Sequence, residues 1–324
     1  MKAAALLFLM VWSCHASALD ASLLKNVEAA RDHEFLAKLQ VAPEASSEER
    51  GNRLRLAAYS GFPDSVEWLL SGPAATPPAA ADKNGFTALM TTFLHPKYLP
   101  TEYTIVRKLL DKGADANMRN ANGATALMLF LESRGERALF GHPIDCELDD
   151  GSATLVPSEP PALAEYQTAT FTLLLQASTD LNSKDQDGRS ALVFATERRL
   201  SAMMRGLLEA GADPNVEIAE FQGKTPIFFA APELVPLLVA RGADPNGADA
   251  NGDRPLHGAM KLRIRNPIEL RSYVKAILAA GARDLPNKKG QYASDTDSPY
   301  GICKGAVQEV MREVLAAIRA ARHP

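Results

Sequence analysis

The residue types best suited to metal chemistry gather in one short stretch of the chain. One imidazole, one thiol and three carboxylates lie there: His142, Asp145, Cys146, Glu147 and Asp149. A zinc site normally needs more soft ligands at fixed spacing, and a calcium loop would need a bidentate Glu where Val156 stands. The stretch therefore favours a solvated acidic loop over a metal-dependent enzyme, which is the alternative from a different class of function.

Elsewhere the sequence contains no catalytic or cofactor motif. There is no G-x-S-x-G, no P-loop, and no Ser, His and acid set at motif spacing. The formal net charge of -4 and the pI near 5.9 disfavour nucleic-acid binding, because phosphate neutralisation needs clustered Lys and Arg. We therefore predict no catalytic residue, no cofactor and no metal.

A short tail rich in Gly, Ala and Asp recurs along the chain and indicates its organisation. Near-identical copies occupy 113–117, 211–215, 242–246 and 281–284, and a worn copy occupies 178–182. Turn glycines recur beside them at intervals of 38, 65, 35, 29 and 38 residues: Gly85, Gly123, Gly188, Gly223, Gly252 and Gly290. Such self-similarity means that one small unit is stacked, because a single unit cannot bury its own apolar face.

Each unit is predicted to contain two helices. Thr or Ser followed by Ala or Pro suits a helix start, with the hydroxyl as N-cap. A second apolar run at helical spacing ends at the glycine of the tail, which takes the left-handed conformation at little steric cost. The Asp-x-Asn stretch and the following Asn-Gly or Asp-Gly pair supply turn chemistry for a short hairpin-like finger.

The four residues that open each first helix carry a family resemblance. They read TALM at 87–90 and 125–128, SALV at 190–193, TPIF at 225–228 and RPLH at 254–257. These are worn copies of T-P-L-H, so the chain resembles the ankyrin-repeat family, whose period is about 33 residues. The resemblance implies an all-α fold: an ankyrin-repeat solenoid of stacked helix pairs with short hairpin-like fingers and helical caps.

The resemblance also assigns a role to one histidine. His257 stands where the family's histidine is structural, so it is not expected to be catalytic. The other copies predict an apolar replacement at the same position: Met90, Met128, Val193 and Phe228.

The chain is predicted to consist of four segments. Residues 1–18 are predicted to be a signal peptide, 19–49 an N-terminal helical cap, 50–288 ankyrin repeats, and 289–324 a C-terminal capping repeat or helix. The 65-residue interval places an insertion at about 134–166, between the two helices of one unit, and a smaller one at 95–100 occupies the equivalent site. The larger insertion is expected to contact a partner or to be a mobile spacer. The shortened unit in which Pro232 starts the second helix is expected to bend the stack.

The first residues have the regions of a secretory signal peptide. Lys2 precedes an apolar run at 3–12, and Ala16 and Ala18 form an A-x-A site that predicts a mature start at Leu19. The mature chain would then be periplasmic or secreted. In an alternative processing route, residues 11–14 act as a weak lipobox and leave Cys14 as a lipidated membrane anchor. A buried N-terminal helix is a further alternative. No later segment reaches the length of a transmembrane span.

The two cysteines that follow the signal lie in distant units, at Cys146 and Cys303. A disulfide needs Cα atoms within about 7 Å, so two isolated thiols are expected.

Binding residues are proposed by position in the repeat. The resemblance implies that finger tips and first helices line a concave face that contacts a protein partner, and the tips are Met118, Arg119, Asn120, Lys184, Asp185, Gln186, Glu217, Phe221, Ala248 and Asp249. From the insertion, His142, Asp145, Glu147 and Asp149 are added. Phe221 lies in a lengthened finger, where it is either an exposed aromatic suited to a binding hot spot or packed onto a neighbouring finger.

The sequence as a whole favours an exported ankyrin-repeat protein that binds another protein and catalyses nothing. It would be a monomer or part of a hetero-complex. Two roles fit: an accessory or scaffold protein for components of a bacterial envelope, and an immunity-type inhibitor of a toxin delivered to the periplasm.

Overall fold

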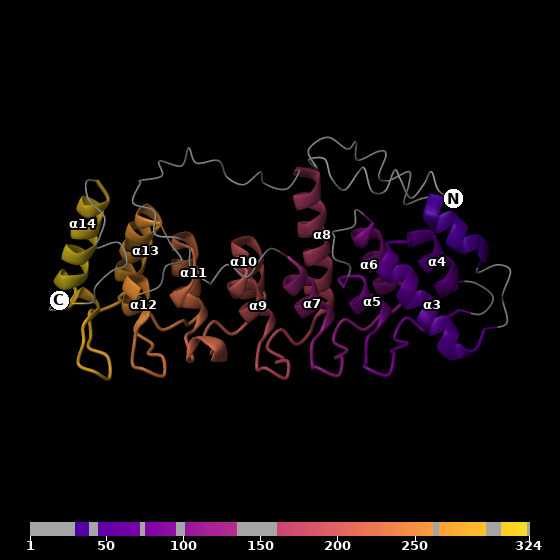
Figure 1. The fold of residues 1–324 in the computed structure, drawn as a ribbon, viewed down its shortest axis with the longest axis horizontal. Coiled ribbons are helices and arrows are strands. Elements are labelled where there is room, and N and C mark those ends of the chain that lie inside the picture. The colour runs from indigo at the N-terminus through magenta and orange to yellow at the C-terminus, as the bar shows by residue number, and fades with distance from the viewer. Residues whose placement is uncertain are drawn as a thin grey trace, which may run out of the picture.

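The computed structural model describes residues 30–38, 45–71, 75–94, 101–134, 161–261, 266–295 and 306–322. Helices lie side by side in a single row, and a loop or finger projects from the same edge at each unit (Figure 1). Within the described ranges the structure contains no β-strand, and one isolated bridge pairs Ile218 with Lys224. The predicted all-α solenoid of stacked helix pairs with fingers is confirmed.

The row consists of helix pairs, with the first helix of each pair next to the fingers. The pairs are α3 (Ser47–Ser60) with α4 (Pro63–Ser71), α5 (Ala88–Thr91) with α6 (Glu102–Asp111), α7 (Ala126–Ser133) with α8 (Pro161–Ala177), α9 (Ala191–Glu197) with α10 (Ser201–Glu209), η2 (Pro226–Phe228) with η3 (Pro232–Leu234) and α11 (Val235–Ala240), and α12 (Pro255–Lys261) with α13 (Pro267–Ala279). A helix at residues 30–38 precedes them, and α14 (Ala306–Ala320) ends the row.

Local chemistry accounts for some helix starts and not others. The Thr87 hydroxyl accepts a hydrogen bond from the Met90 amide at 3.3 Å, and Thr125 does the same for Met128 at 3.4 Å, as expected of N-caps. Ser190 and Thr225 stand in the same position but make no side-chain cap. At the second of these starts, Pro226 occupies the first helical position, which a proline favours.

The core is a continuous apolar layer between successive pairs. The third residue of every T-P-L-H copy is buried in it: Leu89, Leu127, Leu192, Ile227 and Leu256. The fourth position is also buried in the four copies that lack histidine, with Met90, Met128, Val193 and Phe228 each at most 1% exposed. The predicted apolar replacement is therefore confirmed, and each such side chain contributes about 1.5–3 kcal/mol of burial.

An Asx side chain shapes each regular finger from within. Asp249 accepts hydrogen bonds from the Asn251 and Asp253 amides at 2.8 and 2.9 Å, and Asn120 does the same for Asn122 and Ala124. Because the carboxylate or amide oxygen replaces a backbone partner, it satisfies two amides that a tight turn leaves unpaired.

Backbone hydrogen bonds join one finger to the next. The Ala250 amide donates to the Gln222 carbonyl at 2.9 Å, and the Lys288 amide donates to the Asn251 carbonyl at 3.2 Å. Equivalent bonds of 2.7 and 2.8 Å join the first finger to the second and the second to the third. The fingers approach so closely that a Cβ on Gly252 would lie 2.7 Å from the Lys288 nitrogen, and only glycine fits there.

The asparagine of the Asp-x-Asn tail links each unit to the next one. Asn246 donates to the Gly281 carbonyl at 3.0 Å and accepts from the Arg283 amide at 2.8 Å, and Asn215 makes the same pair of bonds to Gly242 and Asp244. The repeated tail is thus both a turn and the polar joint between neighbouring units.

The fourth finger breaks this pattern. Ile218 stands where the other fingers have Asp or Asn, a 3-10 turn (η1, Ala219–Phe221) follows, and Gln222 takes a positive φ of 62°. Among the described residues no backbone hydrogen bond joins this finger to the third. The first helix of the unit shrinks to η2, and Pro232 opens the second helical segment as predicted. The expected bend of the stack stays a prediction.

Two contacts tie this shortened unit into the row. Arg199 in the α9–α10 turn forms an ion pair with Glu269 at the start of α13, and the Tyr273 hydroxyl donates to the Ile227 carbonyl at 2.8 Å. Both Arg199 and Glu269 are about three-quarters buried. The ion pair joins the units on either side of the irregular one, and the Tyr273 bond joins the irregular unit to the unit that follows it.

Both ends of the row are closed by helices. At the N-terminal end, Asp32 accepts hydrogen bonds from the Asp64 and Ser65 amides at 2.7 and 3.0 Å, and the Phe35 and Phe62 rings lie 5.5 Å apart. At the C-terminal end, α14 buries Val307, Val310, Val314 and Ile318, in the segment where the sequence predicts a capping helix.

Arg322, just beyond the end of α14, is engaged within the protein. Its guanidinium lies 3.7 Å from the Tyr292 ring and donates to Ser294 at 2.6 Å and Asp295 at 2.9 Å. A buried Asp284 carboxylate lies within 3.4 Å. Folding back lets the arginine pair with carboxylates of the last finger.

One predicted boundary needs correction, and several predictions lie outside the described residues. The insertion was expected to reach residue 166, but α8 begins at Pro161, and Arg134 at the other edge is buried. The proposed signal peptide at 1–18, the small insertion at 95–100, Cys146 and Cys303 all fall outside the described residues.

We expect Asn246→Ala to lower the free energy of unfolding by about 1–2 kcal/mol, because two hydrogen bonds between units are lost. Urea denaturation measures the change. Asn84→Ala is the control, since that exposed side chain makes no hydrogen bond with the described residues. Equal stability of Asn246→Ala and the wild type would contradict the role assigned to the tail asparagine.

Candidate binding groove

A groove lies between the fingers and the first helices in the N-terminal half of the row. It is lined from the helical side by Leu94, Leu129, Glu132 and Phe194, and from the fingers by Phe86, Asn120, Asn122, Ala124, Asp185, Gln186, Asp187 and Arg189. We call it the inner groove. It spans three fingers and the helices α5, α7 and α9, so its shape depends on the stacking of three units.

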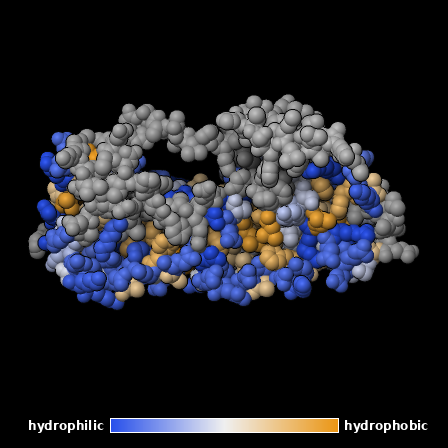
Figure 2. All heavy atoms as spheres, in the orientation of Figure 1, coloured by the Kyte–Doolittle hydropathy of each residue, from blue (hydrophilic) through white to orange (hydrophobic). Residues whose placement is uncertain are grey.

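The floor of the inner groove is apolar. Leu94 is 42% exposed, Phe86 is half-buried, and Leu129 and Phe194 close the floor beneath them. On α3, which packs against α5, Leu56 is 50% exposed. Figure 2 shows hydrophobic side chains right of centre, above the hydrophilic row of finger tips. Exposed apolar side chains gathered on one face are typical of interaction surfaces.

One ionic cluster forms the edge of the inner groove. Arg189 pairs with Asp185 at 2.9 Å and with Asp187 at 3.1 Å, and its guanidinium lies 4.5 Å from the centre of the Phe194 ring. The Asp185 side chain is nearly buried, whereas Asp187 is 74% exposed. The arginine is therefore committed to the protein itself, and Asp187 faces solvent.

A second hollow lies at the tips of the third, fourth and fifth fingers. Its lining includes the charged side chains of Lys184, Asp187 and Glu217 and the small residues Ala219, Ala248 and Ala250. It coincides with the irregular fourth finger, whose 3-10 turn leaves space between neighbouring tips. We call it the finger-tip hollow.

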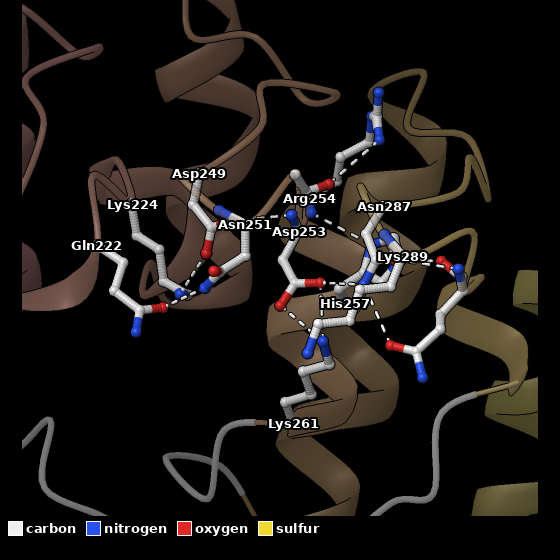
Figure 3. Close-up of polar contacts among 12 residues, drawn as sticks. Gln222, Lys224, Asp249, Asn251, Asp253, Arg254, His257, Lys261, Asn287 and Lys289 are labelled. Atoms are coloured by element: carbon white, nitrogen blue, oxygen red, sulfur yellow. Dashed lines mark hydrogen bonds and ion pairs between the residues drawn. The ribbon is translucent and has the colours of Figure 1, made fainter.

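A polar network joins the last three fingers, as Figure 3 shows. Lys224 of the fourth finger donates to Asp249 of the fifth at 2.5 Å, and both side chains are buried. Asp253 accepts from Lys261 at 2.6 and 2.7 Å and from the Asn287 side chain of the last finger at 2.8 Å. These side-chain contacts add to the backbone hydrogen bonds that already join the same three fingers.

The network sets the charge state of Asp253. Burial by itself would raise the pKa of this carboxyl, but hydrogen bonds from Lys261 and Asn287 and the charge of Lys261 outweigh burial. The pKa of Asp253 therefore lies below its ordinary value of 3.8. The carboxylate remains charged at neutral pH and stabilises the folded state.

His257 is structural, as the resemblance implied. Its ring is 1% exposed, Nδ1 accepts from the Arg254 amide at 3.2 Å, and Nε2 lies 2.9 Å from the Gln291 carbonyl, to which it donates. One imidazole thus bridges α12 and the last finger. With both nitrogens engaged, the ring has no free atom for chemistry.

The structure divides the predicted finger-tip residues between the two hollows. Asn120, Asp185 and Gln186 lie in the inner groove, whereas Lys184, Glu217, Ala248 and Asp249 lie in the finger-tip hollow. The prediction that Asn120, Asp185 and Asp249 contact a partner needs correction. These three side chains are at least nine-tenths buried and form the hydrogen bonds of their own turns.

The remaining predicted tip residues also make contacts within the protein. Met118 is half-buried against the core, and the Arg119 guanidinium donates to the Gly123 and Lys184 carbonyls. Phe221 is not an exposed aromatic: its ring centre lies 5.1 Å from that of Phe229 in the following helical turn. The ring is half-buried against the core of its own unit.

Some predicted partner-binding residues fall outside the described ranges, and some groove residues were not predicted. His142, Asp145, Glu147 and Asp149 lie outside the described residues. The sequence did not predict the residues that line the inner groove from the helical side: Leu94, Leu129, Glu132 and Phe194. A signal was available, because α7 reads ALMLFLES and has more apolar residues than one buried face requires.

The described ranges contain no group of three or more His, Cys, Asp or Glu side chains able to hold a metal ion. A search of those ranges for a helix long and apolar enough to cross a bilayer also finds none.

These features define a class of protein: a helical-repeat solenoid with fingers and a groove along them. The family model for ankyrin repeats in three copies matches residues 162–249. The solved ankyrin repeat domain of Bcl-3 superposes with a TM-score of 0.53 at 20% identity, covering 80% of this chain and 97% of that one. An ankyrin repeat domain from Acinetobacter baumannii AYE gives 0.51 at 24% identity, covering 71% and 98%. The chain contains ankyrin repeats and has the fold of an ankyrin-repeat domain.

Curated proteins give the same result over part of their length. The mouse B-cell lymphoma 3 protein homolog is 26% identical over 247 residues, which is 74% of this chain and 45% of that protein. An ankyrin repeat-containing protein of Treponema pallidum is 33% identical over 118 residues, which is 35% of this chain and 39% of that protein. This chain spans less than half the length of these relatives. Ankyrin repeat domains typically mediate protein–protein interaction.

We expect acid to remove the contribution of Asp253 to stability. Because its pKa is lowered by folding, the contribution is complete above the ordinary value of 3.8 and is lost as the pH falls through the folded-state pKa. Asp253→Asn should cost about 1–3 kcal/mol at pH 7, since hydrogen bonds to a charged group are lost, and should lose less stability than the wild type below pH ~4.

Urea titrations at pH 7 and at about pH 3 measure both effects. Asp111→Asn is the control, because this carboxylate is 69% exposed and lies 3.8 Å from its partner. If the wild type and Asp253→Asn lose the same free energy of unfolding on acidification, the role of Asp253 is refuted.

Proposed function

We propose that this protein is an exported ankyrin-repeat protein that binds another protein in its inner groove and catalyses no reaction. The observation that carries the proposal is the apolar floor of that groove, where Leu94 is 42% exposed on a frame of stacked units. A large exposed leucine in a hollow with a polar edge favours burial against a partner.

The frame around the groove supports a binding role. The Asx turns and the bonds between the first three fingers hold the edge of the groove in place. The groove therefore has its shape before a partner arrives. Preorganisation reduces the entropy cost of association. The known tendency of ankyrin repeats to mediate protein–protein interaction agrees with this role.

The proposal of export depends on the N-terminal sequence alone. The apolar run at 3–12 and the A-x-A site at Ala16 and Ala18 support cleavage near Ala18 and a periplasmic or secreted mature chain. N-terminal mass analysis of the mature protein tests it: a start at Leu19 agrees with soluble export, lipidated Cys14 with a membrane anchor, and an intact Met1 refutes both.

We expect photo-crosslinking from position 94 to capture a protein partner in an extract of the envelope. Crosslinking from position 166 on α8 is the control, because Tyr166 is equally exposed at 48% but lies outside the groove. Capture of the same proteins at equal yield from both positions would refute the groove as the binding site.

The identity of a captured partner separates the two roles. Envelope components agree with an accessory or scaffold protein, and a tight complex with a secreted effector agrees with an immunity-type inhibitor. A variant lacking residues 137–158, which removes the insertion but leaves Arg134 and α8 intact, tests whether the insertion contributes to binding.

A further inference from the structure

The charge of the inner groove narrows the chemistry of its occupant. Its lining has four ionisable side chains: Glu132, Asp185, Asp187 and Arg189. Three carboxylates against one guanidinium give the lining a net charge of -2. The single positive group is already paired with two carboxylates and stacked on Phe194.

The negative charge lies next to the apolar floor rather than away from it. Glu132 on α7 is half-exposed and forms no ion pair with the described residues, and Asp187 is 74% exposed at the opposite edge. Leu94 and Leu129 line the floor of the inner groove. A ligand lying on the leucines would therefore meet carboxylates on both sides.

From this arrangement we propose that the inner groove binds a segment of a partner protein that presents an apolar side chain flanked by Lys or Arg. The proposal rests on the proposed function, because it specifies the partner of the same groove. The apolar side chain is buried on Leu94, and the cations pair with Glu132 and Asp187.

An acidic segment is excluded by the same geometry. Its carboxylates would face those of Glu132 and Asp187, and Arg189 cannot compensate because its guanidinium is engaged within the protein. A purely basic segment would leave the exposed leucine in water. Selectivity thus needs both features together, since like charges repel and apolar burial supplies most of the affinity.

Three labelled peptides of equal length test the proposal with the full chain, by fluorescence polarisation. They carry Leu flanked by Lys, Leu flanked by Glu, and Ser flanked by Lys. We expect the Leu/Lys peptide to bind at least about tenfold more tightly than either of the others, which corresponds to about 1.4 kcal/mol. Equal binding of the three, or preference for Leu/Glu, overturns the proposal.

Two groove variants and a matched control assign the binding to this site. Leu94→Ser should weaken binding of the Leu/Lys peptide about tenfold, because burial of a leucine is lost. Glu132→Lys should weaken it by a similar factor and tighten binding of the Leu/Glu peptide. Tyr166→Ser removes an equally exposed apolar side chain outside the groove and should leave binding unchanged. Urea denaturation verifies that each variant is folded.

A selection from a random-peptide phage library separates failure of this inference from failure of the proposed function. Selected peptides that need Leu94 and are rich in Lys or Arg support the inference. Peptides that need Leu94 but lack basic residues overturn it and leave the groove as a binding site. If no selected peptide depends on Leu94, both proposals fail. A dimer in sedimentation that Leu94→Ser dissociates would show a second copy as the occupant and also overturn the inference.

Discussion

Burial of apolar surface between neighbouring units is the constraint on which the rest of this structure depends. No pair of short helices here has a core of its own: Leu89, Leu127, Leu192, Ile227 and Leu256 are buried because the next unit covers them. Stacked repeats of this kind gain stability from each interface in turn. The ends then need covers, which the helix at residues 30–38 and α14 supply.

Apolar contact alone would not fix how one unit sits on the next, and polar side chains do so. Asn215 and Asn246 join successive tails, the Asx residues shape the fingers, and backbone bonds connect finger to finger. Because hydrogen bonds are directional, they set the orientation that the apolar layer leaves free. The groove keeps its form because its edge is built from these turns, and for the same reason several finger-tip residues are unavailable to a partner.

The fourth finger shows what happens when one element of this system is replaced. Ile218 cannot accept the hydrogen bonds that Asp or Asn would, so the finger closes through a 3-10 turn and loses its bond to the third finger. Lys224 still pairs with Asp249 of the fifth finger, and Arg199 pairs with Glu269 across the shortened unit. The finger-tip hollow lies where the regular spacing of tips is interrupted.

The sequence by itself determined the repeat, the helix pairs, the structural histidine and the last helix, because each depends on local spacing and on residues with special backbone preferences. Its recurring tails and T-P-L-H copies lie within one unit, where neighbours in sequence are neighbours in space. Tertiary structure alone decided which side chains remain exposed. Leu94 and Glu132 belong to different units and meet in one groove only after stacking, and Phe221 turns inward onto Phe229 for a reason that lies in the geometry of its finger. Exposure is a property of the assembled row, since what covers a residue comes from another unit.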